Sequence, residues 1–140
     1  MSDPATPERR ARRQALLQRL IDSQNRSDID GVLACFAHPE VELVGANRRF
    51  TGSDEVGTYL RDSRSAFPDQ RFELIMMHHA DDAVICEFWF GGTHRGDIHG
   101  FEATGRGFRV RMASFFAFDG DDLVGQRIYY DARSIVMQLA

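Results

Sequence analysis

The alternation of apolar and polar positions divides this chain into a helical first half and a strand-rich second half. Over residues 6–23 apolar side chains recur near helical spacing, with arginines on the opposite side, which predicts an amphipathic helix. Ser27 is the expected N-cap of a short second helix that ends near residue 38. Ser53 is the expected N-cap of a third helix, which Pro68 ends.

Strands dominate from residue 70 onward. A brief strand is also expected at 41–44, followed by a turn at 47–49. The longer stretches that predict strands lie at 71–79, 82–94, 106–118 and 123–131, and the tail at 132–139 is expected to be a short helix or ordered coil. A chain in which helices precede long antiparallel strands is typical of the α+β class. In such a domain a curved sheet must fold over the helices so that the apolar faces of both are buried. We therefore predict one α+β domain over residues 1–140, with a cone-shaped curved antiparallel sheet packed on the N-terminal helices and residues 1–8 as a candidate disordered segment.

Strand alternation also predicts which side chains face the interior. Within 106–118 the even positions are nearly all apolar, so we expect this set to line an inner pocket. If the turn after Phe118 places that residue opposite Leu123, Asp131 lies on the inner face and shares it with Tyr129. A slip of one residue in this register would reverse the direction of both side chains.

The strand before it carries two different faces. We expect Phe90 and His94 to point into the pocket. Trp89 points the other way, onto an outer face that also carries arginines, and both residue types are enriched in subunit interfaces. A monomer of this size would leave that face exposed, so we predict a homodimer or a dimer-based oligomer.

Composition narrows the classes of function. The net charge is −4 and the 17 positive side chains are all arginine, so the chain lacks the basic excess of a nucleic-acid-binding surface and has no lysine for Schiff-base chemistry. Cys35 and Cys86 are expected to be free thiols. No apolar run is long enough for a signal peptide or a membrane span, which predicts a cytoplasmic protein without a membrane partner. Four arginines oppose the dipole of the first helix and are expected to form a solvated face or a fraying helix end: Arg9, Arg10, Arg12 and Arg13.

Asp131 and His94 are the candidate catalytic residues. An apolar pocket raises the pKa of a carboxylate, which would let Asp131 take a proton from a carbon beside a carbonyl group. The alternative is a structural role, in which Asp131 caps a helix that starts at Ala132. His94 can polarise a substrate carbonyl or return a proton, or it can anchor its loop through a hydrogen bond to the backbone.

The candidate substrate-binding residues are mostly aromatic. Tyr129 is expected to hydrogen-bond a substrate oxygen, whereas Tyr130 faces the other way and packs within the sheet. The other candidates are Trp89 and four residues that form either pocket wall or plain core: Phe50, Tyr59, Phe90 and Met112. His94, Asp97 and His99 lack the ligand spacing of a zinc site, so no metal is expected.

Short motifs spaced along the chain resemble those of one known family. They are Phe50-Thr51-Gly52, Phe67-Pro68-Asp69, Gly92-Thr93-His94-Arg95-Gly96, Gly100, Ala103-Thr104-Gly105-Arg106, Phe118-Asp119-Gly120, Tyr129-Tyr130-Asp131 and Gln138-Leu139. In combination they resemble the SnoaL-like polyketide cyclase family, from about Arg19 to the end of the chain. The resemblance implies the cone fold shared by nuclear transport factor 2 and ketosteroid isomerase, no cofactor, and an oligomer.

The resemblance also implies a reaction. Characterised members close a ring of an anthracycline-type polyketide ester by an intramolecular aldol reaction with an aspartate as acid/base, and Asp131 occupies the matching position. Those cyclases also use a histidine on the preceding strand, and 106–118 contains none. We therefore expect a cofactor-free cyclase, or a related acid/base enzyme, that acts on a polyketide-like small molecule in an apolar pocket. Epoxide opening, isomerisation, dehydration and ligand binding without turnover are the alternatives on the same fold.

Overall fold

Helices occupy most of the first half of the chain and strands most of the second, as predicted. The computed structural model describes residues 4–98 and 100–140. Its helices are α1 (Pro7–Asn25), α2 (Ile29–Ala34), α3 (Gly52–Ala66) and α4 (Ala132–Leu139), and its strands are β1 (Glu40–Leu43), β2 (Arg48–Thr51), β3 (Arg71–His79), β4 (Ala83–Thr93), β5 (Gly107–Asp119) and β6 (Asp122–Tyr130). In this described part of the chain, no helix is both long and apolar enough to cross a membrane.

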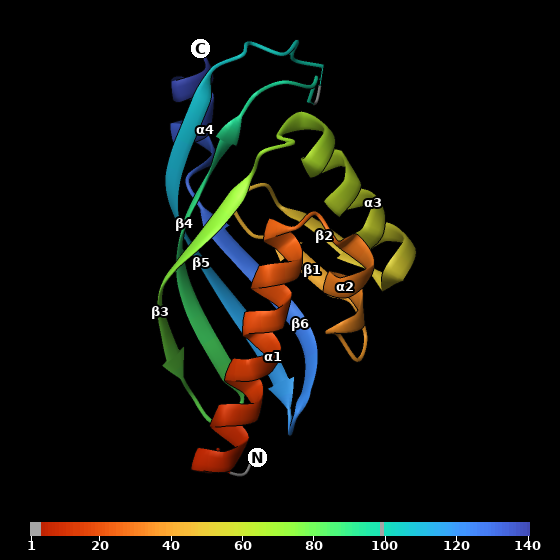
Figure 1. The fold of residues 1–140 in the computed structure, drawn as a ribbon, viewed down its shortest axis with the longest axis vertical. Coiled ribbons are helices and arrows are strands. Elements are labelled where there is room, and N and C mark those ends of the chain that lie inside the picture. The colour runs from red at the N-terminus through yellow and green to blue at the C-terminus, as the bar shows by residue number, and fades with distance from the viewer. Residues whose placement is uncertain (1–3, 99) are drawn as a thin grey trace.

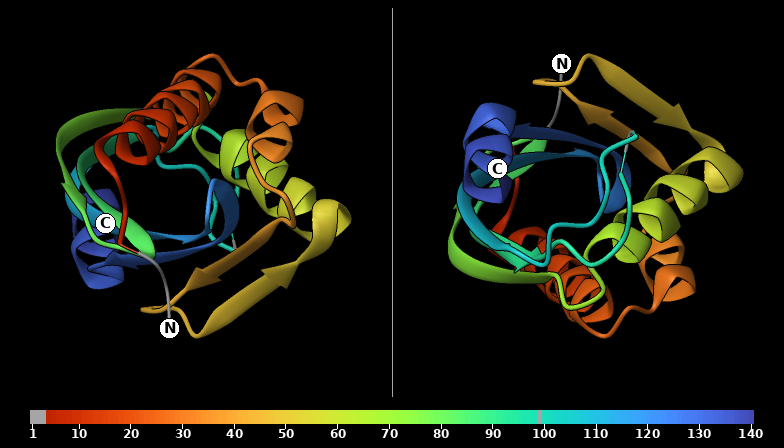
Figure 2. Two further views of the ribbon diagram at one scale, coloured as in Figure 1. Left: turned by 90° about the horizontal axis from the view of Figure 1, so that it is seen from below. Right: turned by 90° about the horizontal axis from the view of Figure 1, so that it is seen from above.

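The strands form one curved sheet that does not close. Their order is β2-β1-β6-β5-β4-β3, and neighbours are antiparallel except for the parallel pair β1 and β6. Figure 1 shows α1, α2 and α3 on one side of the sheet, with α4 near the end where the chain terminates. Along the long axis, the sheet bends around one side of the interior and these three helices cover the other (Figure 2). The predicted α+β class, with a curved sheet packed on N-terminal helices, is confirmed.

The start of α1 is fixed by the residues just before it. The Thr6 hydroxyl accepts a hydrogen bond from the Arg9 N–H at 3.1 Å, and Pro7 takes the first helical position, where its missing N–H is no loss. The helix therefore begins inside the segment 1–8, the candidate for disorder, of which residues 1–3 lie outside the described residues.

Two predicted caps are wrong, and one predicted turn is displaced towards the N-terminus. Asp28 caps α2 with its carboxylate, whereas Ser27 lies in left-handed backbone at φ 59°, which is not the extended conformation of an N-cap. Thr51 precedes α3, so Ser53 already lies within the first turn of that helix. The turn occupies residues 44–47, and the last two positions of the turn expected at 47–49 belong to strand β2, which pairs with β1.

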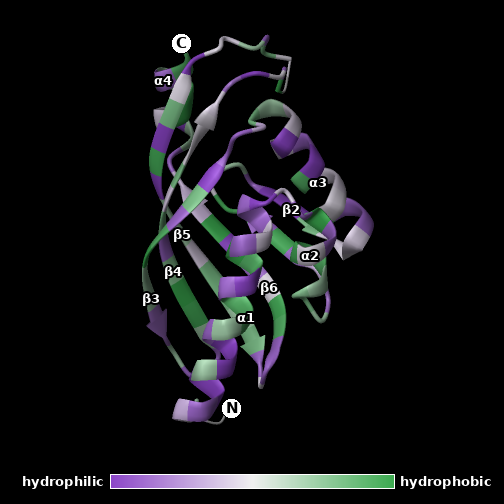
Figure 3. Cartoon of the chain, viewed as in Figure 1, coloured by the Kyte–Doolittle hydropathy of each residue, from purple (hydrophilic) through white to green (hydrophobic). Residues whose placement is uncertain are grey.

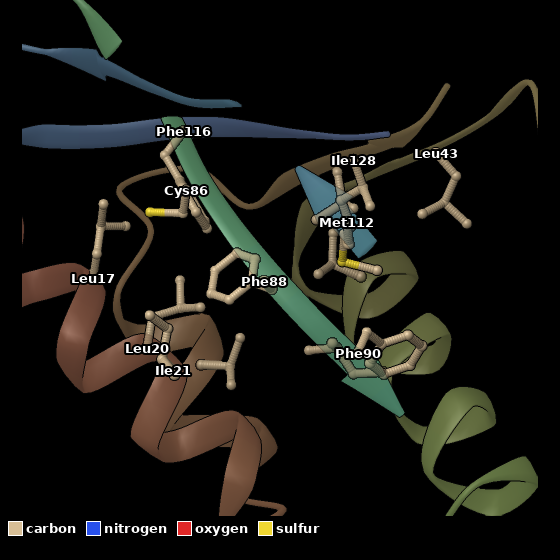
Figure 4. Packing of buried hydrophobic residues seen from close by; sticks show 14 of the residues in the cluster. Leu17, Leu20, Ile21, Leu43, Cys86, Phe88, Phe90, Met112, Phe116 and Ile128 are labelled. Atoms are coloured by element: carbon tan, nitrogen blue, oxygen red, sulfur yellow. The ribbon is translucent and has the colours of Figure 1, made fainter. Parts of the chain in front are cut away.

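The interior is built from alternate residues of β4 and β5, as predicted. Phe88 and Phe90 lie opposite Met112 and Val110, and all four side chains are buried. Leu17 of α1, which is fully buried, packs on the same side of the sheet (Figure 4). Apolar and polar segments alternate along these strands in Figure 3, as they must in strands with one buried face. The even-numbered face of β5 is therefore the inner one.

A β-bulge near the start of β6 changes the register of that strand. Phe118 pairs with Leu123, as predicted, but the preceding residue Ala117 pairs with Gly125. Val124 is therefore an extra residue that has no counterpart on β5.

The bulge reverses the faces predicted for the rest of β6. Met112 pairs with Tyr130, which puts Tyr130 on the inner face with it. Tyr129 pairs with Ala113 on the outer face. The prediction that Tyr129 and Asp131 share the inner face is wrong, because one inserted residue exchanges the two sides of a strand.

Candidate functional site: an apolar cavity beside His94

The curved sheet and helices α1–α3 enclose a cavity of about 450 Å³. Its wall is largely apolar and aromatic, and includes Val56, Leu60, Phe67, Phe72, Phe90 and Met112. Phe101 and Val136 also contribute to the lining although they are 67% and 59% exposed. The cavity therefore reaches the surface between α4 and the loop that joins β4 to β5.

Three of the predicted substrate-binding residues line this cavity, namely Tyr59, Phe90 and Met112. Phe50 is not among the lining residues and lies behind Tyr59, with the two rings stacked at a centroid distance of 4.7 Å. It supports the wall without forming it.

Trp89 lies on the outer face of the sheet, away from the cavity. Strand alternation places it opposite to Phe90, and it pairs with Arg111 on β5. The Arg109 guanidinium lies 3.9 Å from the centre of the Trp89 ring system and that of Arg111 lies 5.1 Å from it. Trp89 is therefore not among the residues that line this cavity, and its predicted outer position is confirmed.

Tyr130, not Tyr129, lines the cavity. Tyr129 is 41% exposed on the outer face, where its ring packs edge-on against Phe115 at 5.5 Å. The prediction for this pair is reversed by the bulge. Gly125, inside an otherwise strand-like stretch, is the sequence signal that could have revealed it, because an isolated glycine in a strand often marks a bulge.

The tyrosines in the wall are hydrogen-bond donors. Burial raises the pKa of the Tyr59 hydroxyl far above its ordinary value of 10.0, and burial also raises the pKa of Tyr130. Both side chains therefore keep their O–H groups at neutral pH. Gln126, a lining residue that the sequence did not single out, donates from its side-chain amide to the Ser114 hydroxyl at 3.1 Å.

His94 is the most deeply buried titratable side chain in the cavity lining, with 2% of its surface exposed. Its Nδ1 accepts a hydrogen bond from the Thr104 backbone N–H at 3.3 Å and lies 3.2 Å from the Thr104 hydroxyl oxygen. Its Nε2 is buried and has no hydrogen-bond partner among the described residues. The predicted inward direction of His94 is confirmed, and the ring also anchors its loop.

The backbone around His94 is held from both sides. The His94 N–H donates to the Arg106 carbonyl at 2.9 Å, and the Gly105 N–H donates to the His94 carbonyl at 2.8 Å. Asp69 accepts hydrogen bonds from the Thr93 hydroxyl at 2.7 Å and from the Thr93 N–H at 2.8 Å. These bonds hold the pKa of Asp69 below its ordinary value of 3.8.

Asp131 caps α4 and is not among the residues that line the cavity. Its carboxylate accepts hydrogen bonds from the backbone N–H groups of Arg133 at 3.0 Å and Ser134 at 3.3 Å. The side chain is exposed. This geometry is the structural alternative that the sequence left open for Asp131.

Groups that could hold a metal ion are not found among residues 4–98 and 100–140. Of the three side chains considered for a metal, His99 lies outside the described residues, and Asp97 accepts a hydrogen bond from the Ala103 N–H at 3.0 Å. Cys35 and Cys86 are free thiols, as predicted, and burial raises the pKa of Cys86 to about 12.

The fold and the cavity define a class of cone-shaped α+β domains in which a curved sheet wraps an apolar interior. Within that class, the family model of the SnoaL-like polyketide cyclases matches residues 14–139, and the chain belongs to this family. The resemblance inferred from the spaced motifs is therefore confirmed. No curated protein matches the chain.

Solved structures with the same fold come from several bacteria. A candidate polyketide cyclase from Xanthomonas campestris pv. campestris has a TM-score of 0.86 at 20% identity, over 94% of this chain and 99% of that one. AclR, a candidate hydroxylase from Streptomyces galilaeus, has a TM-score of 0.78 at 20% identity, over 92% and 96%. A Catenulispora acidiphila protein with a ketosteroid isomerase-like fold, in complex with trimethylamine, has a TM-score of 0.76 at 16% identity, over 88% and 90%. At these identities the likeness shows the fold alone.

Proposed function

We propose that this protein is a cofactor-free enzyme that carries out acid/base chemistry on a polyketide-like molecule in the cavity, with intramolecular aldol-type ring closure as the favoured reaction. The observation that carries the proposal is the buried His94 Nε2, which finds no hydrogen-bond partner in the part of the chain that the structure describes and belongs to a residue that lines an apolar cavity. A buried polar atom without a partner costs free energy, so a ligand atom would complete its hydrogen bonding. Membership of the cyclase family supports the class of reaction.

In the proposed ring closure, a carbon between two carbonyl groups loses a proton. The resulting enolate carbon forms a bond to the carbon of another carbonyl group elsewhere in the same molecule. The oxygen of that carbonyl group becomes an alkoxide and takes up a proton. His94 Nε2 would hydrogen-bond one of these oxygens as negative charge develops, and a fixed donor in a dry cavity stabilises such charge more than water does. The Tyr59 and Tyr130 hydroxyls are further donors in the same wall.

The cavity would also contribute by shape. A flexible chain that must fold back on itself loses much of its freedom before the bond can form. Because the wall is mostly apolar and aromatic, it would favour a compact, partly planar conformer of the substrate. Positioning of this kind can lower the barrier by several kcal/mol.

The proton acceptor is assigned to the rim of the cavity and not to Asp131. Asp131 is exposed, caps α4 and is not a lining residue. The carboxylates that do contribute to the lining are Asp62 and Glu102, both at exposed positions. One of these two would take the proton from the activated carbon.

Ligand binding without turnover is the second candidate function. It is favoured by one observation: the buried part of the cavity wall, as far as the structure describes it, contains no carboxylate. In that case polycyclic ligands would bind, and no open-chain ester would be converted.

The experiment is ring closure of a linear poly-β-keto ester by the purified protein, followed by chromatography and mass spectrometry. His94→Phe keeps a ring of similar size but removes both nitrogens, and turnover should fall by at least about 10²-fold. His94→Gln places an amide N–H near the position of Nε2 and should recover a large part of the activity. If His94 were the base, both variants would lose activity alike.

Circular dichroism and thermal unfolding of both His94 variants serve as controls for folding. Full turnover in a folded His94→Phe variant would overturn the proposal. If the wild-type protein bound the ester without converting it, the second candidate function, ligand binding without turnover, would be favoured.

A further inference from the structure

We infer that Thr104 holds the His94 imidazole in the form protonated on Nε2, so that the cavity presents a hydrogen-bond donor at this point and selects ligands that carry an acceptor oxygen there. The inference rests on the proposed function only in assuming that a ligand occupies the cavity. The role assigned to Thr104 is that of a positioning residue, because it acts through the His94 ring.

Two groups of Thr104, the backbone N–H and the hydroxyl, lie beside one ring nitrogen of His94. The Thr104 backbone N–H donates to Nδ1 at 3.3 Å. The Thr104 hydroxyl oxygen lies 3.2 Å from the same nitrogen and itself accepts a hydrogen bond from the Arg106 N–H at 3.2 Å. Since that oxygen already acts as an acceptor, its own O–H is available to donate to Nδ1. A proton on Nδ1 would face the backbone N–H, so in the neutral ring the proton lies on Nε2.

Thr104 is itself fixed by the strands on either side of its loop. The loop returns to the sheet through the bonds that join the backbone of His94 to Gly105 and Arg106. Gly105 has φ 72°, in the left-handed region that glycine adopts without strain, and this lets the chain turn into β5 directly after Thr104. The hydroxyl is thus held beside Nδ1 by the same backbone that carries the ring.

The consequence is a rule for the ligand. The Nε2–H of His94 is buried, and within the described residues it has no acceptor. A carbonyl, enolate or phenolate oxygen placed there completes its hydrogen bonding, whereas a methylene group leaves the donor unsatisfied. A site built around a buried donor discriminates strongly against the analogue that lacks the acceptor.

The tautomer is measured directly by long-range ¹H–¹⁵N correlation spectra of protein labelled with ¹⁵N-histidine. The His94 signals are identified by their loss in His94→Phe. We expect an unprotonated nitrogen at Nδ1 and an N–H at Nε2 in the wild-type protein and in Thr104→Ser. Thr104→Val loses the hydroxyl but keeps the backbone N–H beside Nδ1, so it should shift only part of the population towards the other tautomer. A proton on Nδ1, alone or in a doubly protonated ring, would overturn the inference.

Binding is measured by calorimetry with 9-fluorenone and fluorene, two planar tricyclic probes that differ by one carbonyl oxygen. The wild-type protein should bind fluorenone about 10-fold more tightly than fluorene. Thr104→Ser, which retains the hydroxyl, should keep this preference, and Thr104→Val should reduce it to about threefold or less. Equal affinities of the wild-type protein for both probes, or an unchanged preference in Thr104→Val, would contradict the role assigned to Thr104.

These results separate the two claims. A protein that never converts an ester can still show the predicted tautomer and the preference for fluorenone, in which case only the enzymatic proposal fails. A protein that closes rings while the His94 proton resides on Nδ1 would still be an enzyme, but Nε2 could not act as the donor, and this inference would fail.

Discussion

At the scale of the single residue, His94 uses its two ring nitrogens differently: one anchors the loop and the other faces the cavity. Its direction could be predicted, because strand alternation with Phe90 is enough to place it on the inner face. Its partner Thr104 could not, since that residue comes from the loop between β4 and β5, whose path no periodicity defines. The ring is held at Nδ1 and leaves Nε2 to the cavity.

The strand end that carries His94 should respond to acid through Asp69. Hydrogen bonds from Thr93 hold the pKa of Asp69 in the folded state below the 3.8 of a free side chain. A carboxyl group whose pKa is lowered by folding stabilises the protein above the pKa of the unfolded state, and this contribution is lost as the pH falls through the folded-state value.

The free energy of unfolding of Asp69→Asn should therefore be lower than that of the wild type at neutral pH. This difference should shrink as the pH falls from about 5 to about 2. Urea denaturation over this range measures it, with Asp119→Asn, at the exposed end of β5, as the control. A difference that does not depend on pH would refute the contribution of Asp69.

At the scale of the element, the apolar pattern predicted where strands lie better than how they pair. The predicted bounds of β3 are those observed, and those of β4, β5 and β6 differ by one residue at each end. The register of β6 failed because Val124 is inserted into an otherwise regular ladder. Periodicity reports burial, and the adjacent apolar residues Leu123 and Val124 are equally compatible with a bulge or with a regular strand.

Helix α4 depends on the same residue that was expected to be catalytic. Asp131→Ala removes the acceptor of two backbone N–H groups and should lower the free energy of unfolding by about 1 kcal/mol. Asp131→Asn should cost only a few tenths of that, because asparagine caps nearly as well. Urea denaturation measures the free energy of unfolding of both variants, and equal losses of stability in the two would contradict the capping role of Asp131.

At the scale of the whole molecule, the N-terminal end of α1 lies opposite to the end that carries α4 and the β4–β5 loop (Figure 1). Arg13, expected on a solvated face, is 2% exposed, and that prediction is wrong for this residue. Its guanidinium donates to the carbonyls of Gly120 at 3.0 Å and Asp81 at 2.9 Å, and lies over the Phe118 ring. It thereby joins α1 to the β3–β4 and β5–β6 turns, which lie together beside the helix N-terminus in Figure 1.

Arg13→Met should lower the free energy of unfolding by about 2–4 kcal/mol, because it removes the charged donor of two hydrogen bonds that join α1 to the two turns. Arg12→Met is the matched control on the same helix. The Arg12 side chain is 55% exposed and forms an ion pair with Asp121 at 3.1 Å, and exposed pairs contribute about 0–1 kcal/mol. Similar losses of stability in the two variants, measured by urea denaturation, would contradict the role of Arg13 in joining α1 to the two turns.

The outer face of the sheet is the surface through which we predict that two copies of the chain form a dimer. Trp89 and its two arginines share that face with Tyr129, and the neighbouring β3 exposes Met76 at 51%. Burial of this face against a second copy would remove apolar surface from water. Light scattering should report twice the mass of one chain at micromolar concentration, and a monomer there would contradict the prediction.

The most direct test of the central claim compares His94→Phe with Asp131→Asn in one ring-closure assay. The geometry predicts that His94→Phe lowers turnover at least about 10²-fold, since His94 lines the cavity and its Nε2 has no partner within residues 4–98 and 100–140. Asp131→Asn should stay within about twofold of the wild type, since Asp131 caps α4 outside that cavity. The opposite order, with turnover lost in Asp131→Asn and retained in His94→Phe, would contradict the account.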